Sequence, residues 1–103
     1  MDYVLLEWDH DLDDEPYLVY SELDEKRMER RKVEFFRGGL CFAYGAERGN
    51  DGALAEKPFP EDLREITGGE EGECTVRSIS RQLFQEIWYQ AQERPDGFMS
   101  MFF

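Results

Sequence analysis

The segment of residues 9 to 16, DHDLDDEP, holds the side chains near the start of the chain that could do chemistry. Alternating aspartates are typical of calcium-binding loops, and an aspartate beside a histidine is typical of acid–base catalysis. A carboxylate cluster without nearby cations can also attract a positively charged partner. These three functions make different demands on the rest of the sequence.

The match to a calcium-binding loop fails at the positions that define that motif. Asp9, Asp11 and Asp13 match the first three ligand positions of an EF-hand loop. The sixth position should be glycine and the twelfth glutamate, but Asp14 and Tyr20 stand there. We therefore expect no metal site and no cofactor, and the segment is either a solvated hairpin loop or an acidic patch that faces a partner.

Catalysis lacks a recognisable anchor. His10 is the only histidine, so a site with two histidine ligands is excluded, and we expect His10 to be a strand-end residue hydrogen-bonded to a neighbour. Cys41 and Cys74 form no C-x-x-C pair and are expected to be reduced core residues. No P-loop, G-x-S-x-G or G-x-G-x-x-G motif is present. We predict that the chain is not an enzyme.

The balance of charge favours a basic protein partner. The chain has 24 acidic and 12 basic residues, a net charge of −12, and no Lys or Arg precedes Lys26. Nucleic acids and anionic membranes are bound through Lys and Arg, so neither is expected as a partner. The sequence shows neither a secretory leader nor an apolar run near the ~18 residues that span a bilayer, and we expect a cytoplasmic protein.

A basic block in residues 26 to 37 follows the acidic segment. We expect it to pair with Glu22 and Asp24 across adjacent antiparallel strands, because opposite charges there lie within reach. Anion binding is the alternative. The block consists of Lys26, Arg27, Arg30, Arg31, Lys32 and Arg37.

The elements that must position these residues are mostly strands. Alternating apolar residues predict strands over 2–8, 16–23, 28–37, 40–45 and 74–79. The first two should form a hairpin, and Gly38-Gly39 should form the turn between the third and fourth. Residues 45–57 carry three glycines and predict a loop, with a bulge or a short irregular strand.

Two helices are predicted after that loop. Residues 59–69 suggest a short helix with Pro60 in its first turn and Gly68 as its stop, followed by a second acidic loop at 70–73. Ser80 is a good N-cap for the clearest helix, 81–94. The apolar stripe of that helix consists of Leu83, Phe84, Ile87, Trp88 and Ala91.

These elements predict an α+β fold over a single domain, residues 1–103. The expected architecture is an antiparallel meander of about five strands, with the C-terminal amphipathic helix packed on one face. The apolar tail 98–103, FMSMFF, could pack on the sheet as a final strand or core plug. If it is exposed, a homodimer or a partner groove would cover it.

Residues 7–39 and 78–92 resemble a family of short uncharacterised bacterial proteins. The shared pattern is a Trp-x-His strand, a Glu-Pro turn, a Tyr-Ser-Glu strand, an Arg-Lys-x-Glu strand before a Gly turn, and a closing Glu-Ile-Trp helix. The resemblance implies no known chemistry. Some small acidic bacterial proteins of this general kind serve as immunity proteins beside toxins.

The sequence therefore favours an immunity protein that occludes the active site of a basic, nuclease-type toxin. The alternative is an intracellular interaction or regulatory module that self-associates through its C-terminal tail. A deep pocket lined by Trp8, Tyr44 or Trp88 would instead favour a small-molecule binder. The residues assigned to the toxin-facing surface are Asp9, Asp11, Asp13, Asp14, Glu15, Glu70, Glu71 and Glu73.

Overall fold

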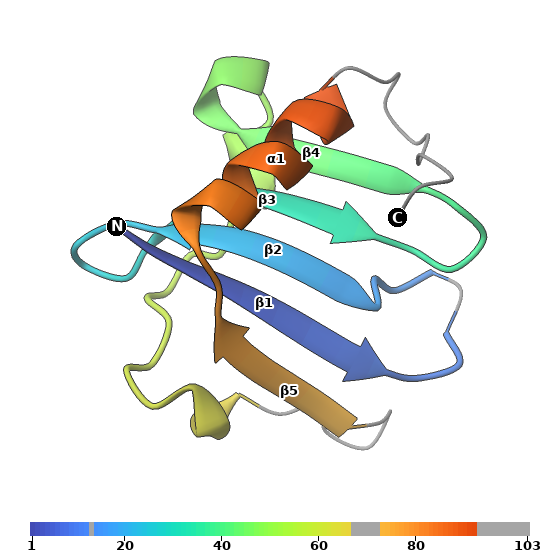
Figure 1. The fold of residues 1–103 in the computed structure, drawn as a ribbon, viewed down its shortest axis with the longest axis horizontal. Helices are drawn as coiled ribbons and strands as arrows, with labels where there is room; N and C mark the ends of the chain where they lie inside the picture. The colour runs from blue at the N-terminus through green and yellow to red at the C-terminus, as the bar shows by residue number, and fades with distance from the viewer. Residues whose placement is uncertain (13, 67–72, 93–103) are drawn as a thin grey trace.

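The computed structural model describes residues 1–12, 14–66 and 73–92. The main elements are five strands and one α-helix (Figure 1). Their bounds are β1 Asp2–Asp9, β2 Leu18–Leu23, β3 Glu29–Phe35, β4 Cys41–Gly45, β5 Glu73–Ser78 and α1 Arg81–Gln92. The predicted α+β fold, with an antiparallel sheet and a C-terminal helix, is confirmed.

The strands form one open sheet in the order β4-β3-β2-β1-β5. The first four make the predicted meander, in which Leu5 pairs with Tyr20, Tyr20 with Val33, and Val33 with Ala43. The fifth strand does not extend the meander beside β4. It returns to the other edge and pairs antiparallel with β1, so the first strand of the chain lies inside the sheet.

The turn between β3 and β4 forms as predicted. Gly38 and Gly39 both have positive φ angles, 89° and 95°, which residues with a Cβ adopt only with strain. The amide of Phe36 donates to the carbonyl of Leu40 at 2.9 Å and closes the hairpin.

Helix α1 covers one face of the sheet across its β1 to β4 side (Figure 1). Phe84, Ile87, Trp88 and Ala91 are buried against the sheet, and the rings of Phe84 and Tyr3 lie 5.3 Å apart. Four of the five predicted stripe residues are thus in the core. The fifth, Leu83, was predicted to belong to the same stripe, and that prediction was wrong.

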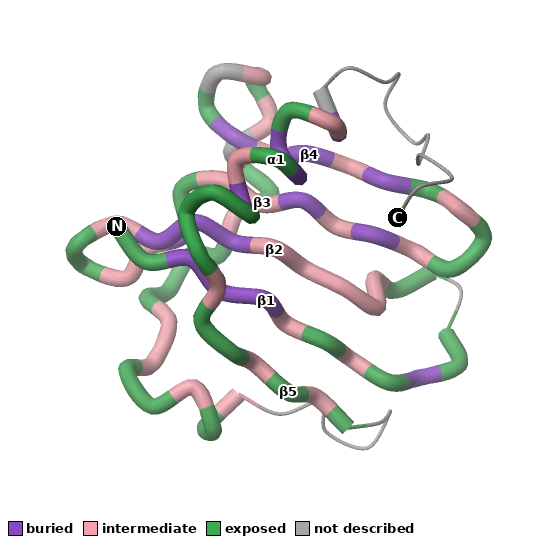
Figure 2. The backbone as a smooth tube through the Cα atoms, viewed as in Figure 1, coloured by how far each residue is buried: buried purple, intermediate pink, exposed green. Residues whose placement is uncertain are grey.

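Leu83 is 37% exposed, because the stripe that meets the sheet is narrower than the sequence pattern suggested. The predicted N-cap is confirmed, since the Ser80 hydroxyl accepts a hydrogen bond from the amide of Leu83 at 3.0 Å. Figure 2 shows the buried positions concentrated beneath α1, whereas β5 is only half-buried or exposed.

Residues 46–66 run along the face opposite α1 and contain three short 3₁₀ turns, Ala46–Arg48, Asp51–Ala53 and Leu63–Glu65. Neither a bulge nor an irregular strand forms in the 45–57 loop among the described residues. Instead the Asn50 side chain hydrogen-bonds to the backbone of β4, accepting from Gly45 and donating to Ala43. The side chain satisfies backbone groups that another strand would otherwise bond.

The helix predicted over 59–69 was wrong. Only Leu63–Glu65 turns, capped by the Asp62 carboxylate, and Gly68 lies outside the described residues. The first turn of a helix fixes several backbone angles for a single hydrogen bond, which is unfavourable. A segment this short does not extend into a longer helix. Its chain path is fixed instead by Arg27, whose guanidinium donates to the carbonyls of Phe59 and Pro60.

The two cysteines are free, as predicted. Cys41 is buried on β4 and Cys74 is half-buried on β5, and these strands are the two opposite edges of the sheet. A disulfide between them is therefore excluded by the topology.

Candidate functional site

Asp9 and Glu73, one residue from each of the two acidic stretches singled out in the sequence, lie side by side at one end of the sheet. The register of β1 and β5 places Asp9 directly beside Glu73, and the β1–β2 turn continues from the same point. We call this region the acidic end. Its described residues are Glu7, Asp9, Asp11, Asp14, Glu15 and Glu73. Asp13, Glu70 and Glu71, which were assigned to the same surface, lie outside the described residues.

His10 holds the shape of the β1–β2 turn. It is 4% exposed, its Nε2 lies 2.9 Å from the carbonyl oxygen of Pro16, and its Nδ1 lies 2.9 Å from the amide of Leu12. A carbonyl needs a donor and an amide needs an acceptor, so these partners fix the neutral tautomer with its proton on Nε2. The predicted structural role is confirmed, and both ring nitrogens are engaged.

The carboxylates of the acidic end remain largely unneutralised. Two arginines approach them: Arg37 lies 3.9 Å from Asp9, and Arg77 lies 3.4 Å from Glu7. Six carboxylates against two guanidiniums leave a local charge of −4. The Asp9 side chain is 90% exposed, so these ion pairs are in water and weak.

A shallow groove of about 270 Å³ opens beside these carboxylates. Tyr17 and Leu18 form its half-buried apolar part, and the guanidinium of Arg37 lies 5.5 Å over the Tyr17 ring. Leu12, at the tip of the turn, is also 37% exposed. The acidic end therefore combines negative charge with exposed apolar surface.

The basic block pairs with acids, as predicted, but not always with the expected ones. Glu22 binds Arg31 through two hydrogen bonds, with Nε at 2.8 Å and Nη2 at 2.7 Å. Asp24, however, accepts from the backbone amides of Lys26 and Met28 and shapes the β2–β3 turn. The prediction that Asp24 would pair with a basic side chain was wrong, because a turn brings its own amides closer.

The other pairs of the block do not join neighbouring strands, because Lys32 and Glu34 both lie on β3 and Arg27 lies between β2 and β3. Arg27 binds Asp2 at 3.0 Å, and Lys32 lies 3.4 Å from Glu34. Most of the positive charge of the block is thereby neutralised within the sheet.

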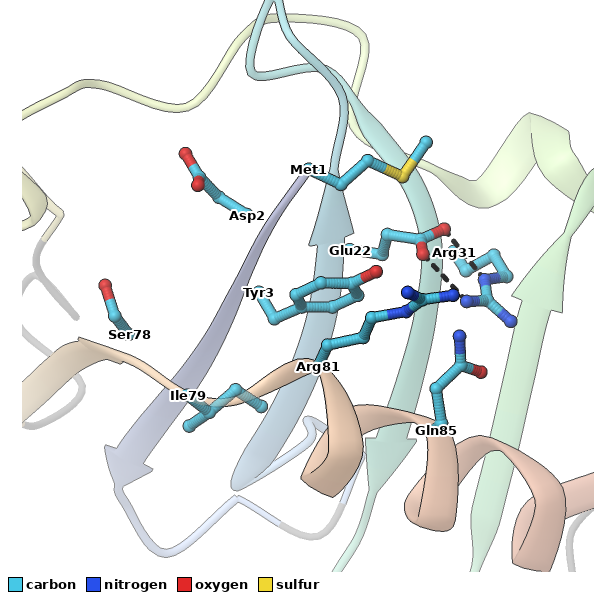
Figure 3. A pocket seen from close by; sticks show the side chains of 9 residues that line it. All are labelled: Met1, Asp2, Tyr3, Glu22, Arg31, Ser78, Ile79, Arg81 and Gln85. Carbon is cyan, nitrogen blue, oxygen red and sulfur yellow. Dashed lines mark hydrogen bonds and ion pairs between the residues drawn. The ribbon is translucent and has the colours of Figure 1, made fainter.

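A second, larger hollow lies between α1 and the opposite end of the sheet. It has a volume of about 680 Å³, and its polar wall consists of Tyr3, Glu22, Arg31, Arg81 and Gln85. Figure 3 shows the Arg81 guanidinium reaching from the first turn of α1 toward Glu22, Arg31 and the Tyr3 hydroxyl. We call this hollow the arginine pocket.

Electrostatics in the arginine pocket favour the ionised form of Glu22. Burial alone would raise the pKa of Glu22, but hydrogen bonding and charge from Arg31, with contributions from Tyr3 and Arg81, lower that pKa overall. The pKa of Tyr3 is raised by burial and by the neighbouring Glu22 carboxylate, which accepts a hydrogen bond from its hydroxyl. Tyr3 thus remains a neutral donor.

The described residues show no assembled metal or nucleophilic centre. Across residues 1–12, 14–66 and 73–92, no three Asp, Glu, His or Cys side chains gather as metal ligands would. Burial raises the pKa of the Cys74 thiol, which disfavours the reactive thiolate. Of the aromatic residues proposed to line a deep pocket, Trp8 borders the shallow groove, and Trp88 is buried in the core.

Sequence reasoning missed the groove and the arginine pocket. Tyr17 follows the acidic segment directly, and Arg81 and Gln85 stand four residues apart on one helix face, so each had a local signal. The missing information was the pairing of β5 with β1, which brings the start of α1 to Tyr3 and Glu22.

Fold and sites together define a small acidic α+β protein built on an open antiparallel sheet. The chain belongs to the family described as Domain of unknown function (DUF6881), whose model matches residues 2–93. This agrees with the resemblance to an uncharacterised family. Neither the curated proteins nor the solved structures contain a match. None of the described helices is long and apolar enough to cross a membrane.

Proposed function

We propose that this protein binds a basic protein partner through the acidic end, and that the partner is a nuclease-type toxin whose active site it occludes. The observation that carries the proposal is the pairing of Asp9 with Glu73, one residue from each of two acidic stretches that are distant in the sequence. A nuclease cleft is positively charged because it holds phosphates, so exposed carboxylates can occupy it as the substrate does.

The groove supplies an apolar anchor, which charge alone cannot provide. Interfaces owe most of their affinity to a few buried anchors, and aromatic residues are enriched among them. Tyr17 and Leu18 offer an apolar surface beside the carboxylates of the acidic end, where a side chain of the partner would pack. The surrounding carboxylates would then set the orientation and accelerate encounter, to about 10⁸–10⁹ M⁻¹s⁻¹ at low salt.

The test uses the C-terminal domain of any large protein encoded by an adjacent gene, purified as a catalytically inactive variant. Its affinity and association rate would be measured by surface plasmon resonance at low and physiological salt. We expect fast association that slows as salt is added, and loss of the domain's nuclease activity when active toxin is mixed with one equivalent of this protein.

A pair of variants with equal net charge separates the surface from bulk acidity. The first changes Asp9, Asp11 and Asp14 to Asn, and the second changes the exposed Glu56, Glu61 and Glu65 to Gln. We expect the first to slow association at least tenfold more than the second. Equal effects of the two triple variants, or inhibition that ignores both, would rule out the acidic end as the interface.

A further inference from the structure

The arginine pocket is lined by two arginines and two carboxylates, in a chain that is otherwise strongly acidic. Each carboxylate that borders it already has a cationic partner, because Asp2 binds Arg27 and Glu22 binds Arg31. Arg81 makes no hydrogen bond or ion pair with any residue that the structure describes, although it lies close enough to Glu22 to lower its pKa. One guanidinium therefore faces the pocket without a carboxylate of its own.

Contacts on several sides hold Arg31, a charged residue in the wall of the pocket, in place. The Arg31 guanidinium lies 5.0 Å over the Phe84 ring and 4.8 Å over the Trp88 ring, and Glu22 grips it through two hydrogen bonds. Because Glu22 also accepts from the Tyr3 hydroxyl, most of its acceptor capacity is used. The Tyr3–Glu22–Arg31 chain is thus a fixed floor, and Arg81 is the adaptable part above it.

Other groups in the pocket complement a small negatively charged molecule. Gln85 stands one helical turn after Arg81, and its amide points into the same space (Figure 3). The first turn of α1 adds the positive end of the helix dipole. Ile79 and the Met1 side chain provide an apolar wall, and a volume of about 680 Å³ is typical of small-molecule sites.

We propose that the arginine pocket binds a small organic anion with a carboxylate or phosphate group. Arg81 holds the anionic group in the forked, two-bond geometry that guanidinium favours, and Gln85 donates a further hydrogen bond. Arg31 contributes its field from below, while the body of the molecule lies against Ile79. This site is at the end of the sheet away from the acidic end and is independent of any toxin.

The experiment follows two-dimensional NMR spectra of the full ¹⁵N-labelled chain during titration with two separate probes, inorganic phosphate and succinate. Ionic strength is held constant with sodium chloride, so that general screening does not change. We expect saturable shifts at the amides of Tyr3, Arg81 and Gln85. Saturation with only one probe supports the proposal and identifies the anionic group as a phosphate or a carboxylate.

Arg81→Gln should weaken the binding at least tenfold, and Gln85→Glu should weaken it similarly by placing a negative charge in the pocket. Arg64→Gln is the matched control, because Arg64 is highly exposed on the short turn near β5 and does not border the pocket. All three changed positions are at least partly exposed, and a native-like spectrum checks that each variant is folded. Unsaturable shifts, or equal affinity in the Arg81 and Arg64 variants, would overturn the proposal.

Discussion

At the scale of single residues, His10 shows how a side chain suited to chemistry can be committed to structure. Both ring nitrogens form hydrogen bonds with backbone atoms of the β1–β2 turn. The ring also packs against Trp8 in an edge-to-face arrangement, with the two ring centroids 4.3 Å apart. The turn carries half of the described carboxylates of the acidic end, so its histidine determines how those carboxylates are presented.

His10→Ala should therefore destabilise the protein by roughly 1–3 kcal/mol, because it removes two partly buried hydrogen bonds and the packing of the buried ring against Trp8. Urea denaturation followed by far-UV circular dichroism measures the change. Asp11→Ala is the control, since Asp11 is exposed in the same turn and should change the unfolding free energy by less than about 0.5 kcal/mol. Equal stability of the two variants would contradict the role of the imidazole.

Glu22 predicts a particular dependence of stability on pH. Its pKa is lower in the folded protein than the ordinary value of 4.5, so the folded state binds the proton less readily than the unfolded chain. The stabilisation from Glu22 is complete above the ordinary pKa and is lost as pH falls through the lowered folded pKa.

Glu22→Gln should accordingly cost about 2 kcal/mol at pH 7, because it breaks a charge-assisted pair to Arg31. The difference from the unmodified protein should shrink as pH falls below 4.5. Urea midpoints at pH 7, 4.5 and 3 would measure it. A difference that stays constant over this range would show that the ion pair is not what the substitution removes.

At the scale of elements, the close approach of α1 to the sheet depends on Gly45, the last residue of β4. A Cβ there would lie 3.2 Å from the Arg31 side chain and 3.2 Å from the Trp88 ring. Neither neighbour can yield easily, because Trp88 is buried in the core and Arg31 is held by Glu22. The backbone at Gly45 is extended, so the constraint comes from packing rather than from φ.

Gly45→Ala should destabilise the protein by roughly 1–3 kcal/mol through overpacking. Gly52→Ala is the matched control, since nothing lies within 4 Å of the added methyl and its φ is not positive. It should be neutral or slightly stabilising. Thermal unfolding of both variants gives the comparison, and similar melting temperatures would mean that α1 can shift away from β4 without cost.

Most elements could be predicted from sequence because their signals are local. The hairpin turn needs the positive φ of Gly38 and Gly39, and the Ser80 cap needs only the next turn of helix. The position of β5 could not be predicted, because pairing with β1 is decided by residues distant in the chain. The failed helix at 59–69 has the same cause, since Arg27 fixes that segment from another element.

The candidate sites also combine features that are visible in the local sequence with contacts that are not. The acids from Asp9 to Glu15 are visible as a run in the sequence, but their meeting with Glu73 depends on the register of β5. Tyr3, Glu22 and Arg81 come from three elements, and no spacing along the chain brings them together. A contact between distant elements has no counterpart in local sequence pattern.

At the scale of the whole molecule, the net charge of −12 works against folding. Like charges confined in a compact state repel one another, and added salt screens that repulsion. The acidic end concentrates the effect, because among the residues that the structure describes only Arg37 and Arg77 form ion pairs with its carboxylates.

The melting temperature should therefore rise as sodium chloride increases from about 20 mM to about 200 mM, where screening shortens from ~20 Å to below ~10 Å. Asp11→Asn combined with Asp14→Asn should be at least as stable as the unmodified protein at low salt, and its salt response should be smaller. Differential scanning calorimetry measures both. A clear loss of stability in this double variant would mean that these exposed carboxylates serve the fold itself.

The pairing of β5 with β1 also shapes how the protein is made. While the chain is being synthesised, β1 can pair with β2 early, but the backbone groups on its other side wait until Ser78 has emerged. During that interval a largely apolar strand presents an open edge, which is the kind of template that recruits strands from other chains. The growing polypeptide is therefore exposed to misassembly at this edge of β1 until β5 has been made, and the pairing of β5 with β1 ends that exposure.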